Sequence, residues 1–225
     1  MRYLFVVAHP DDEVLGAGAT ISSLVEAGHE VTVMTLSMHS PTRKDKLLTE
    51  QAESHKILGV KKAINKGYET MKFGTYSRYE MVQDIEEAII AEKPDIIVTH
   101  NLDDIHNDHR ITSQLVNESA RLPQRGTGYT KPIAALMHME VLSSTEWNFG
   151  SSFSPNAFSP VNENHIQNKT AAIACYDEVI RAVPHPRNLE TIKALARYRG
   201  SQCGAEYAEA FNCRYLDISA LNGGR

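Results

Sequence analysis

The first forty residues place the strongest constraint on the fold. They contain a continuous apolar run at 3–8 (YLFVVA), a helix-like stretch at 13–27 and a second run at 30–36 (EVTVMTL). A short, uninterrupted apolar run is typical of a parallel strand that is buried on both faces. Two such runs joined by a helix predict a βαβ unit, whose crossover is right-handed.

The rest of the chain continues the alternation of helix and strand. We expect further strands at 62–66, 95–99 and 133–142, a long loop at 143–163, and helices at 45–58, 78–92, 108–121, 165–182, 187–198 and 205–211. This pattern predicts a Rossmann-like, doubly wound and mostly parallel sheet flanked by helices. The length of 225 residues predicts a single domain over 1–225 that is large enough to bury its core without a structural metal ion.

Composition excludes several classes of function. The net charge of −5 gives no general electrostatic reason to bind nucleic acid. Three cysteines without CxxC spacing argue against a disulfide framework and favour a reducing cytoplasm. The amino terminus lacks the apolar length of a signal peptide, and no stretch approaches the roughly 20 apolar residues of a membrane span.

Two clusters of polar side chains directly follow two of the predicted strands. The first is HPDDE at 9–13, and the second is HNLDDIHNDH at 100–109. In open α/β sheets, sites form at the carboxyl ends of the strands, next to the point where the strand order reverses. If the strand order is the common 3-2-1-4, the two clusters face each other across one crevice.

A nucleotide-binding site is the obvious alternative for such a fold, and the first loop argues against it. A dinucleotide fold carries GxGxxG after its first strand, whereas this chain has Pro10, Asp11 and Asp12 there. Two carboxylates would repel a pyrophosphate. Gly16 and Gly18 come later, inside the predicted helix, where they are expected to allow close packing against the sheet.

Imidazole and carboxylate side chains together suit a borderline divalent metal, zinc above all. A catalytic zinc site has three protein ligands and an open position for water, which the metal makes more acidic. The first loop offers His9 and an aspartate, and the second offers a histidine. The alternative for a single aspartate such as Asp12 is a helix cap. Six acids and four histidines confined to two loops favour a shared metal site.

These residues resemble the PIG-L/LmbE family of zinc-dependent N-deacetylases. The resemblance rests on AHPDDE after the first strand, HNDH after a later one, and the closing segment RYRGSQCGAEYAEAF. It implies one zinc ion per chain and assigns roles to six residues. The implied ligands are His9, Asp12 and His109, and Asp11 is the implied general base. His106 and Asp108 are the implied catalytic pair near the metal, in which His106 stabilises an oxyanion or donates a proton to the leaving amine. A carboxylate bonded to an imidazole would favour the protonated histidine.

The implied reaction is hydrolysis of the N-acetyl group of an N-acetylglucosamine-type sugar or glycoconjugate, in which Asp11 activates a water bound to the zinc. One alternative is a metal-dependent amidase acting on a different, non-acetyl sugar or thiol conjugate. A non-catalytic sugar- or metal-binding protein is a third, although it would be expected to lack Asp11 or a ligand. The resemblance also implies a homo-oligomer.

Three further residues are candidates for substrate binding. His185 and Arg187 lie in the stiff turn VPHPRN between two predicted helices, and each is equally compatible with a solvated turn. Trp147, the only tryptophan, offers an aromatic face of the kind that stacks on sugars, although packing explains it as well.

Overall fold

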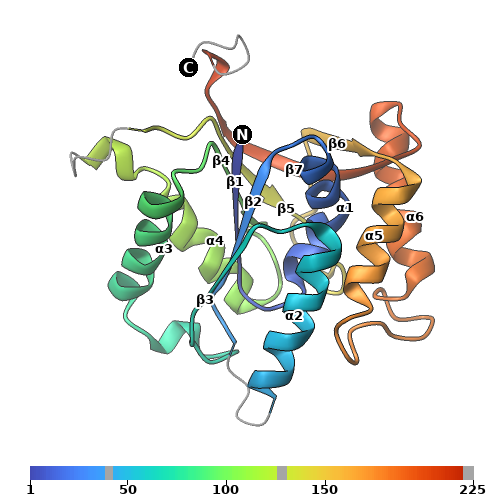
Figure 1. The fold of residues 1–225 in the computed structure, drawn as a ribbon, viewed down its shortest axis with the longest axis horizontal. Coiled ribbons are helices and arrows are strands. Elements are labelled where there is room, and N and C mark those ends of the chain that lie inside the picture. Colours follow the sequence, from blue (N-terminus) through green and yellow to red (C-terminus); the bar gives the residue numbers. More distant parts are fainter. Residues whose placement is uncertain (39–42, 126–130, 220–225) are drawn as a thin grey trace.

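The computed structural model describes residues 1–38, 43–125 and 131–219. In this part of the chain one mixed sheet has the strand order β3-β2-β1-β4-β5-β7-β6 (Figure 1). The parallel strands are β1 (Arg2–Val7), β2 (Glu30–Thr35), β3 (Lys62–Asn65), β4 (Ile96–His100) and β5 (Ala135–Met139). β7 (Tyr207–Leu216) runs in the opposite direction and pairs antiparallel with β5 on one side and with the edge strand β6 (Ala157–Val161) on the other. The expected 3-2-1-4 order is confirmed.

Helices cover both faces of the sheet (Figure 1). One face packs against α1 (Asp12–Glu26), α2 (Lys44–Leu58), α5 (Glu163–Ile173) and α6 (Leu189–Cys203), and the other against α3 (Arg78–Glu92) and α4 (Asn107–Ser119). Because side chains alternate along a strand, Phe5 and Val7 pack into the core beneath α1, while Leu4 and Val6 pack into the core beneath α3 and α4. Burial on both faces explains why β1 reads as a continuous apolar run.

The predicted carboxyl-terminal third is wrong in two places. Residues 205–211 were expected to be a helix, but β7 begins at Tyr207. Alanine and glutamate favour helix locally. Here the backbone hydrogen bonds of β5 and β6 on either side of β7 override that preference. The expected loop at 143–163 contains a short helix, η3 (Thr145–Trp147), and β6.

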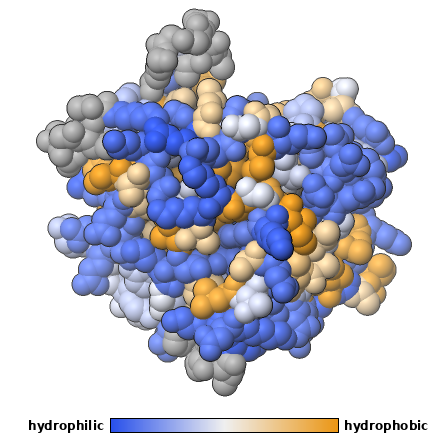
Figure 2. All heavy atoms as spheres, viewed as in Figure 1, coloured by the Kyte–Doolittle hydropathy of each residue, from blue (hydrophilic) through white to orange (hydrophobic). Residues whose placement is uncertain are grey.

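The two helices before β7 also have different bounds from those expected. α5 ends at Ile173 rather than near 182, and α6 extends to Cys203 rather than 198. The segment between them, 174–188, is therefore a long connection that includes the VPHPRN turn. Hydrophilic residues cover most of the face in Figure 2, with apolar side chains scattered among them. Among the described residues, no helix has the length and apolar character needed to cross a membrane.

Gly16 and Gly18 have different neighbours. A Cβ atom at Gly16 would lie 2.5 Å from Sδ of Met139, so this glycine lets α1 approach β5 as expected. A Cβ atom at Gly18 would lie 3.0 Å from Cγ of Lys169 on α5. Gly18 therefore makes room for another helix rather than for the sheet.

Candidate metal centre

The two polar clusters meet at the carboxyl ends of β1 and β4, which are neighbours in the sheet. Asp11 occupies the amino-terminal cap position of α1 with φ 98° and ψ −26°, a region that non-glycine residues rarely adopt. Its side chain caps no backbone N–H group. A strained residue of this kind persists only where the surroundings enforce it, and such residues gather at functional sites.

Three side chains form a nearly equilateral triangle. Nδ1 of His9 lies 3.3 Å from Oδ2 of Asp12, Nε2 of His109 lies 3.3 Å from the same oxygen, and the two nitrogens are 3.3 Å apart. Donor atoms held about 2.0–2.1 Å from a tetrahedral zinc ion lie about 3.3–3.4 Å from one another. The triangle thus matches one face of a zinc coordination tetrahedron, and it is made of the three ligands that the family resemblance implied.

Each of the three side chains has a second partner that fixes its orientation. Nε2 of His9 lies 3.1 Å from Oδ2 of Asp108, and Nδ1 of His109 lies 3.3 Å from Oδ1 of Asp104. Asp12 accepts the backbone N–H of His9 at 2.8 Å. When a metal displaces one proton from each ring, these contacts keep the remaining ring proton on the nitrogen that faces the carboxylate, and the triangle nitrogens can bind the metal.

Two more histidines border the triangle. His100 is fully buried, but its Nε2 accepts the backbone N–H of Ala8 at 2.9 Å, so that lone pair is already used. Nδ1 of His106 accepts the backbone N–H of Asp108 at 3.2 Å, which leaves Nε2 of His106 to face a ligand. The rings of His106 and His109 stack with centroids 4.6 Å apart.

Electrostatics divide the triangle into one anion and two protonated rings. Burial disfavours the charge of His9, but hydrogen bonds to Asp108 and Asp12 outweigh it and raise its pKa to about 9. Burial acts the same way on His109, and Asp12 and Asp104 raise its pKa to about 10. The positive charge of His109 overcomes the burial of Asp12 and holds the pKa of that carboxyl well below its usual range.

Asp11 behaves in the opposite way. Burial and the neighbouring charge of Asp12 raise its pKa to about 8, while Arg187 opposes the rise. Nη1 of Arg187 lies 3.4 Å from Oδ2 of Asp11, and Nε of Arg187 donates to the hydroxyl of Ser143 at 2.5 Å. Two adjacent aspartates thus differ: Asp12 stays ionised, and Asp11 titrates near neutral pH.

One expected contact forms with a different partner. We expected Asp108 to bond His106 and to favour its protonated form, but the Asp108 carboxylate bonds His9 and the backbone N–H of Met71 instead. Burial and the charge of His109 lower the pKa of His106 to about 4. His106 is therefore a neutral imidazole at neutral pH and can act as a hydrogen-bond donor through Nε2.

Of the three predicted substrate residues, only Arg187 contacts a residue of the candidate site. Arg187 reaches the site through its contact with Asp11. His185 is exposed, and its Nδ1 accepts the backbone N–H of Arg187 within its own turn. Trp147 is 53% exposed on η3 and meets Phe149 edge-on with ring centroids 5.7 Å apart.

Sequence reasoning missed Asp104 and His55, which help to hold the loops together. Asp104 accepts the hydroxyls of Ser144 and Thr145 as well as the ring of His109. Glu13, fully buried, contacts Nε2 of His55 on α2 at 2.8 Å. The available signal was the position of Asp104 within the second cluster, whereas His55 sits in an ordinary helical pattern and gave none.

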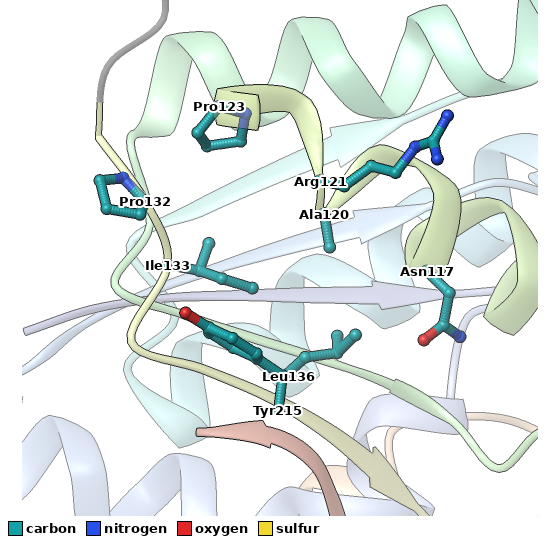
Figure 3. Close-up of a pocket in the computed structure, with 8 residues that line it drawn as sticks. All are labelled: Asn117, Ala120, Arg121, Pro123, Pro132, Ile133, Leu136 and Tyr215. Carbon is teal, nitrogen blue, oxygen red and sulfur yellow. The ribbon is translucent and has the colours of Figure 1, made fainter. Parts of the chain in front are cut away.

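A separate cavity of about 190 Å³ lies away from this site. It is lined by Asn117, Ala120, Arg121, Pro123, Pro132, Ile133, Leu136 and Tyr215 (Figure 3). Leu136 stands near the start of β5, whereas the metal cluster lies at the carboxyl ends of the parallel strands. The cavity therefore does not belong to the candidate metal centre.

A short segment of the chain is similar to a curated relative from Mycobacterium avium (strain 104), a 1D-myo-inositol 2-acetamido-2-deoxy-alpha-D-glucopyranoside deacetylase. It is 57% identical over 37 residues, which is 16% of this chain and 12% of that protein. The chain thus aligns with about an eighth of the length of this relative.

Solved structures match over nearly the whole chain. The conserved protein TT1542 from Thermus thermophilus has a TM-score of 0.76 at 25% identity, covering 96% of each chain. The N,N'-diacetylchitobiose deacetylase of Pyrococcus horikoshii has a TM-score of 0.73 at 20% identity, covering 98% of this chain and 88% of its own. The 4-carboxy-2-hydroxymuconate hydratase GalB of Pseudomonas putida has a TM-score of 0.75 at 20% identity, covering 97% of this chain and 98% of its own. A hydratase among these neighbours means that the fold alone does not decide the reaction.

The family is decided by the sequence. The model of the PIG-L family, described as GlcNAc-PI de-N-acetylase, matches residues 4–120, which include most of β1, all of β2 to β4 and both polar loops. The chain therefore belongs to the PIG-L family.

Proposed function

We propose that this chain is a zinc-dependent hydrolase that removes the N-acetyl group from an N-acetylglucosamine-type sugar or glycoconjugate. The observation that supports it most is the 3.3 Å triangle of His9, Asp12 and His109 beside a buried carboxyl, Asp11, that stays outside the triangle. Membership of the PIG-L family and the deacetylases among its relatives agree with this reaction. One zinc ion per chain is the proposed cofactor.

The three triangle atoms would hold the metal. A bound zinc ion supplies a Lewis acid for the amide carbonyl and lowers the pKa of a water ligand to about 7. Asp104 and Asp108 keep the ring nitrogens of His109 and His9 oriented toward the metal, because each carboxylate accepts the opposite ring N–H.

Asp11 is the proposed acid and base. Its carboxylate accepts a proton from the attacking water, whose oxygen forms a bond to the acetyl carbon. The same carboxyl then returns the proton to the amide nitrogen as the carbon–nitrogen bond breaks, which releases acetate and a free amine. The carboxyl of Asp11 has a pKa of about 8 in the metal-free protein, and the positive charge of a bound zinc ion would lower it, so that Asp11 could accept the proton at neutral pH and return it later.

His106 is proposed to donate a hydrogen bond to the carbonyl oxygen as negative charge develops there. Its Nδ1 accepts the N–H of Asp108, so the proton of the neutral ring is on Nε2. A fixed, neutral donor stabilises the developing charge without needing to be protonated first. His185, Arg187 and Trp147 remain predicted substrate residues, and Arg187 also contacts Asp11.

Acetate release from a panel of substrates tests the proposal. Zinc-loaded protein is offered N-acetylglucosamine, diacetylchitobiose, nucleotide-linked N-acetyl sugars and a glucosaminyl conjugate, with chelator-treated protein as a control. We expect chelator-sensitive acetate release from at least one member. Release of a larger acid from a different conjugate would favour the alternative amidase, and zinc binding without any hydrolysis would favour a binding protein.

A matched pair of variants tests the role of Asp11. Asp11→Asn is expected to keep zinc and to lose activity by about a hundredfold or more. Asp103→Asn, which removes an exposed carboxylate from the second loop, is the control and should keep both. Near-normal activity of Asp11→Asn would contradict the assignment.

The remaining expectations stay predictions. These are a single domain over 1–225, a homo-oligomer and a cytoplasmic location. Light scattering on the purified protein gives the oligomeric state directly.

A further inference from the structure

Helix α1 is interrupted one turn after it begins. Ala17 has φ −146° and ψ 20°, far from helical values, although helix geometry continues on both sides. In an unbroken helix the N–H of Ala19 would donate to the carbonyl of Leu15. Here the N–H of Ala19 donates to Glu209 Oε1 at 3.2 Å, and the N–H of Thr20 donates to Oε2 at 2.6 Å.

The carbonyl of Leu15 also has a new partner. Nζ of Lys169 on α5 donates to it at 2.7 Å and to Oε1 of Glu209 on β7 at 2.5 Å. The Lys169–Glu209 ion pair is thus inserted between the donor and the acceptor of one helical hydrogen bond. Gly18 permits this arrangement, because a Cβ atom there would lie 3.0 Å from Cγ of Lys169.

Stability does not explain such an ion pair. Lys169 and Glu209 are each only 5% exposed. Burying two charges costs about as much free energy as their attraction returns, and apolar replacements of similar volume are often neutral or stabilising. The free-energy cost of burying both charges indicates that the ion pair does more than hold α5 and β7 together.

The interrupted turn carries the candidate site. Asp11 and Asp12 open it, and the N–H of Leu15 closes it on the carbonyl of Asp11 at 2.9 Å. Because the helix is broken at Ala17, the orientation of this turn is set by the hydrogen bond from Lys169 on one side and by the Glu13–His55 contact on the other. We propose that the Lys169–Glu209 ion pair is a positioning device that interrupts α1 and thereby places Asp12 in the metal triangle and Asp11 beside it. The inference rests on the proposed zinc site.

A double apolar variant tests the idea. Lys169→Met with Glu209→Leu removes both charges and leaves the N–H of Ala19 free to bond to the carbonyl of Leu15. We expect Ala17 to return to helical φ and ψ in a crystal structure and the zinc dissociation constant, measured by chelator competition, to rise about tenfold or more. The melting temperature of the metal-free protein should stay level or rise, which a merely structural role would not produce.

Controls separate this inference from the proposed function. Lys193→Met with Glu163→Leu removes a half-exposed ion pair between α6 and α5 and should leave zinc affinity unchanged. Zinc affinity within twofold of wild type in the Lys169/Glu209 variant, or Ala17 still at its present φ, would overturn the inference. Absence of acetate release by the wild-type protein would count against the proposed function only, because neither readout depends on turnover.

A milder variant covers the case in which the double variant does not fold. Glu209→Asp keeps both charges but shortens the side chain that reaches Ala19 and Thr20. We expect it to weaken zinc binding by several-fold, and unchanged affinity would again overturn the inference.

Discussion

Removing the positive charge of Arg187 should move the pH dependence of the reaction. Asp11 must be ionised to accept a proton, and Arg187 lowers its pKa against the effects of burial and Asp12. In Arg187→Met the pKa of Asp11 therefore rises. The acid limb of the kcat/KM profile shifts to higher pH, while the rate on the alkaline plateau is retained.

The size of this shift follows from the contact. Two unit charges 3.4 Å apart attract by about 5 kcal/mol at an effective dielectric constant near 20. The side chain of Arg187 is 26% exposed, so water and salt screen part of that attraction. Nearby opposite charges usually move a carboxyl pKa by about one to three units. We expect about one unit, which is roughly a tenfold loss of rate on the acid limb.

The assay is a kcat/KM profile from pH 5 to 10 with the substrate found in the panel. Arg187→Lys keeps the charge and should shift the limb less than Arg187→Met does. Arg181→Met removes an exposed arginine from the same connection and should not shift it. If Arg187→Met raises KM at every pH and leaves the limb within about 0.3 units, the arginine binds substrate and does not tune Asp11.

Three other perturbations have defined outcomes. His109→Ala should reduce bound zinc, measured by elemental analysis, from one per chain to a small fraction, because a corner of the triangle is lost. Gly16→Ala should lower the free energy of unfolding by about 1–3 kcal/mol, measured by urea titration, because its Cβ would lie 2.5 Å from Sδ of Met139. Burial, and to a smaller extent the charge of Arg214, lowers the pKa of His138 to about 4 in the folded protein. In the unfolded chain this histidine keeps its ordinary pKa of about 6.5, so as the pH falls it is protonated there first. As the pH falls from 7 to 4.5, the free energy of unfolding of the wild-type protein should therefore drop by about 2 kcal/mol more than that of His138→Met, measured in the same assay.

The first half of the fold could be predicted because its signals are local. Continuous apolar runs identify β1 and β4, and the rules of parallel sheets make those strands neighbours. His9, Asp12 and His109 come together for that reason, since each lies in the loop or first helical turn that follows one of these two strands. Local pattern and topology predict that the two loops meet, whereas the choice of Asp12 and His109 as ligands came from the resemblance to the PIG-L/LmbE family.

The second half depends on contacts between distant segments. β7 contains helix-favouring residues such as Ala208 and Ala210, and it is a strand only because β5 and β6 flank it. Lys169 and Glu209 are 40 residues apart, and each lies in a segment whose local pattern gives no reason to expect a buried charge. The neutral state of His106 was missed for a similar reason, because the burial of His106 and the positive charge of His109 that lower its pKa both depend on the folded arrangement.

The charges of the triangle suggest how it exists with and without a metal ion. With pKa values of about 9 and about 10, His9 and His109 each hold an extra proton at neutral pH, and these balance Asp12 and its neighbouring carboxylates. A zinc ion brings the two positive charges that those two protons supplied. Binding should therefore release close to two protons per zinc at pH 7 and weaken steeply as pH falls.

Calorimetry of zinc binding in buffers of different ionisation enthalpy counts the protons that are released. His109→Ala removes one of the two protonated rings and should lower the count by about one in whatever binding remains. Release of fewer than one proton by the wild-type protein would mean that the rings are neutral before the metal arrives. The charge balance would then come from Arg187 and the surrounding carboxylates, and the triangle would be held in place by hydrogen bonds alone.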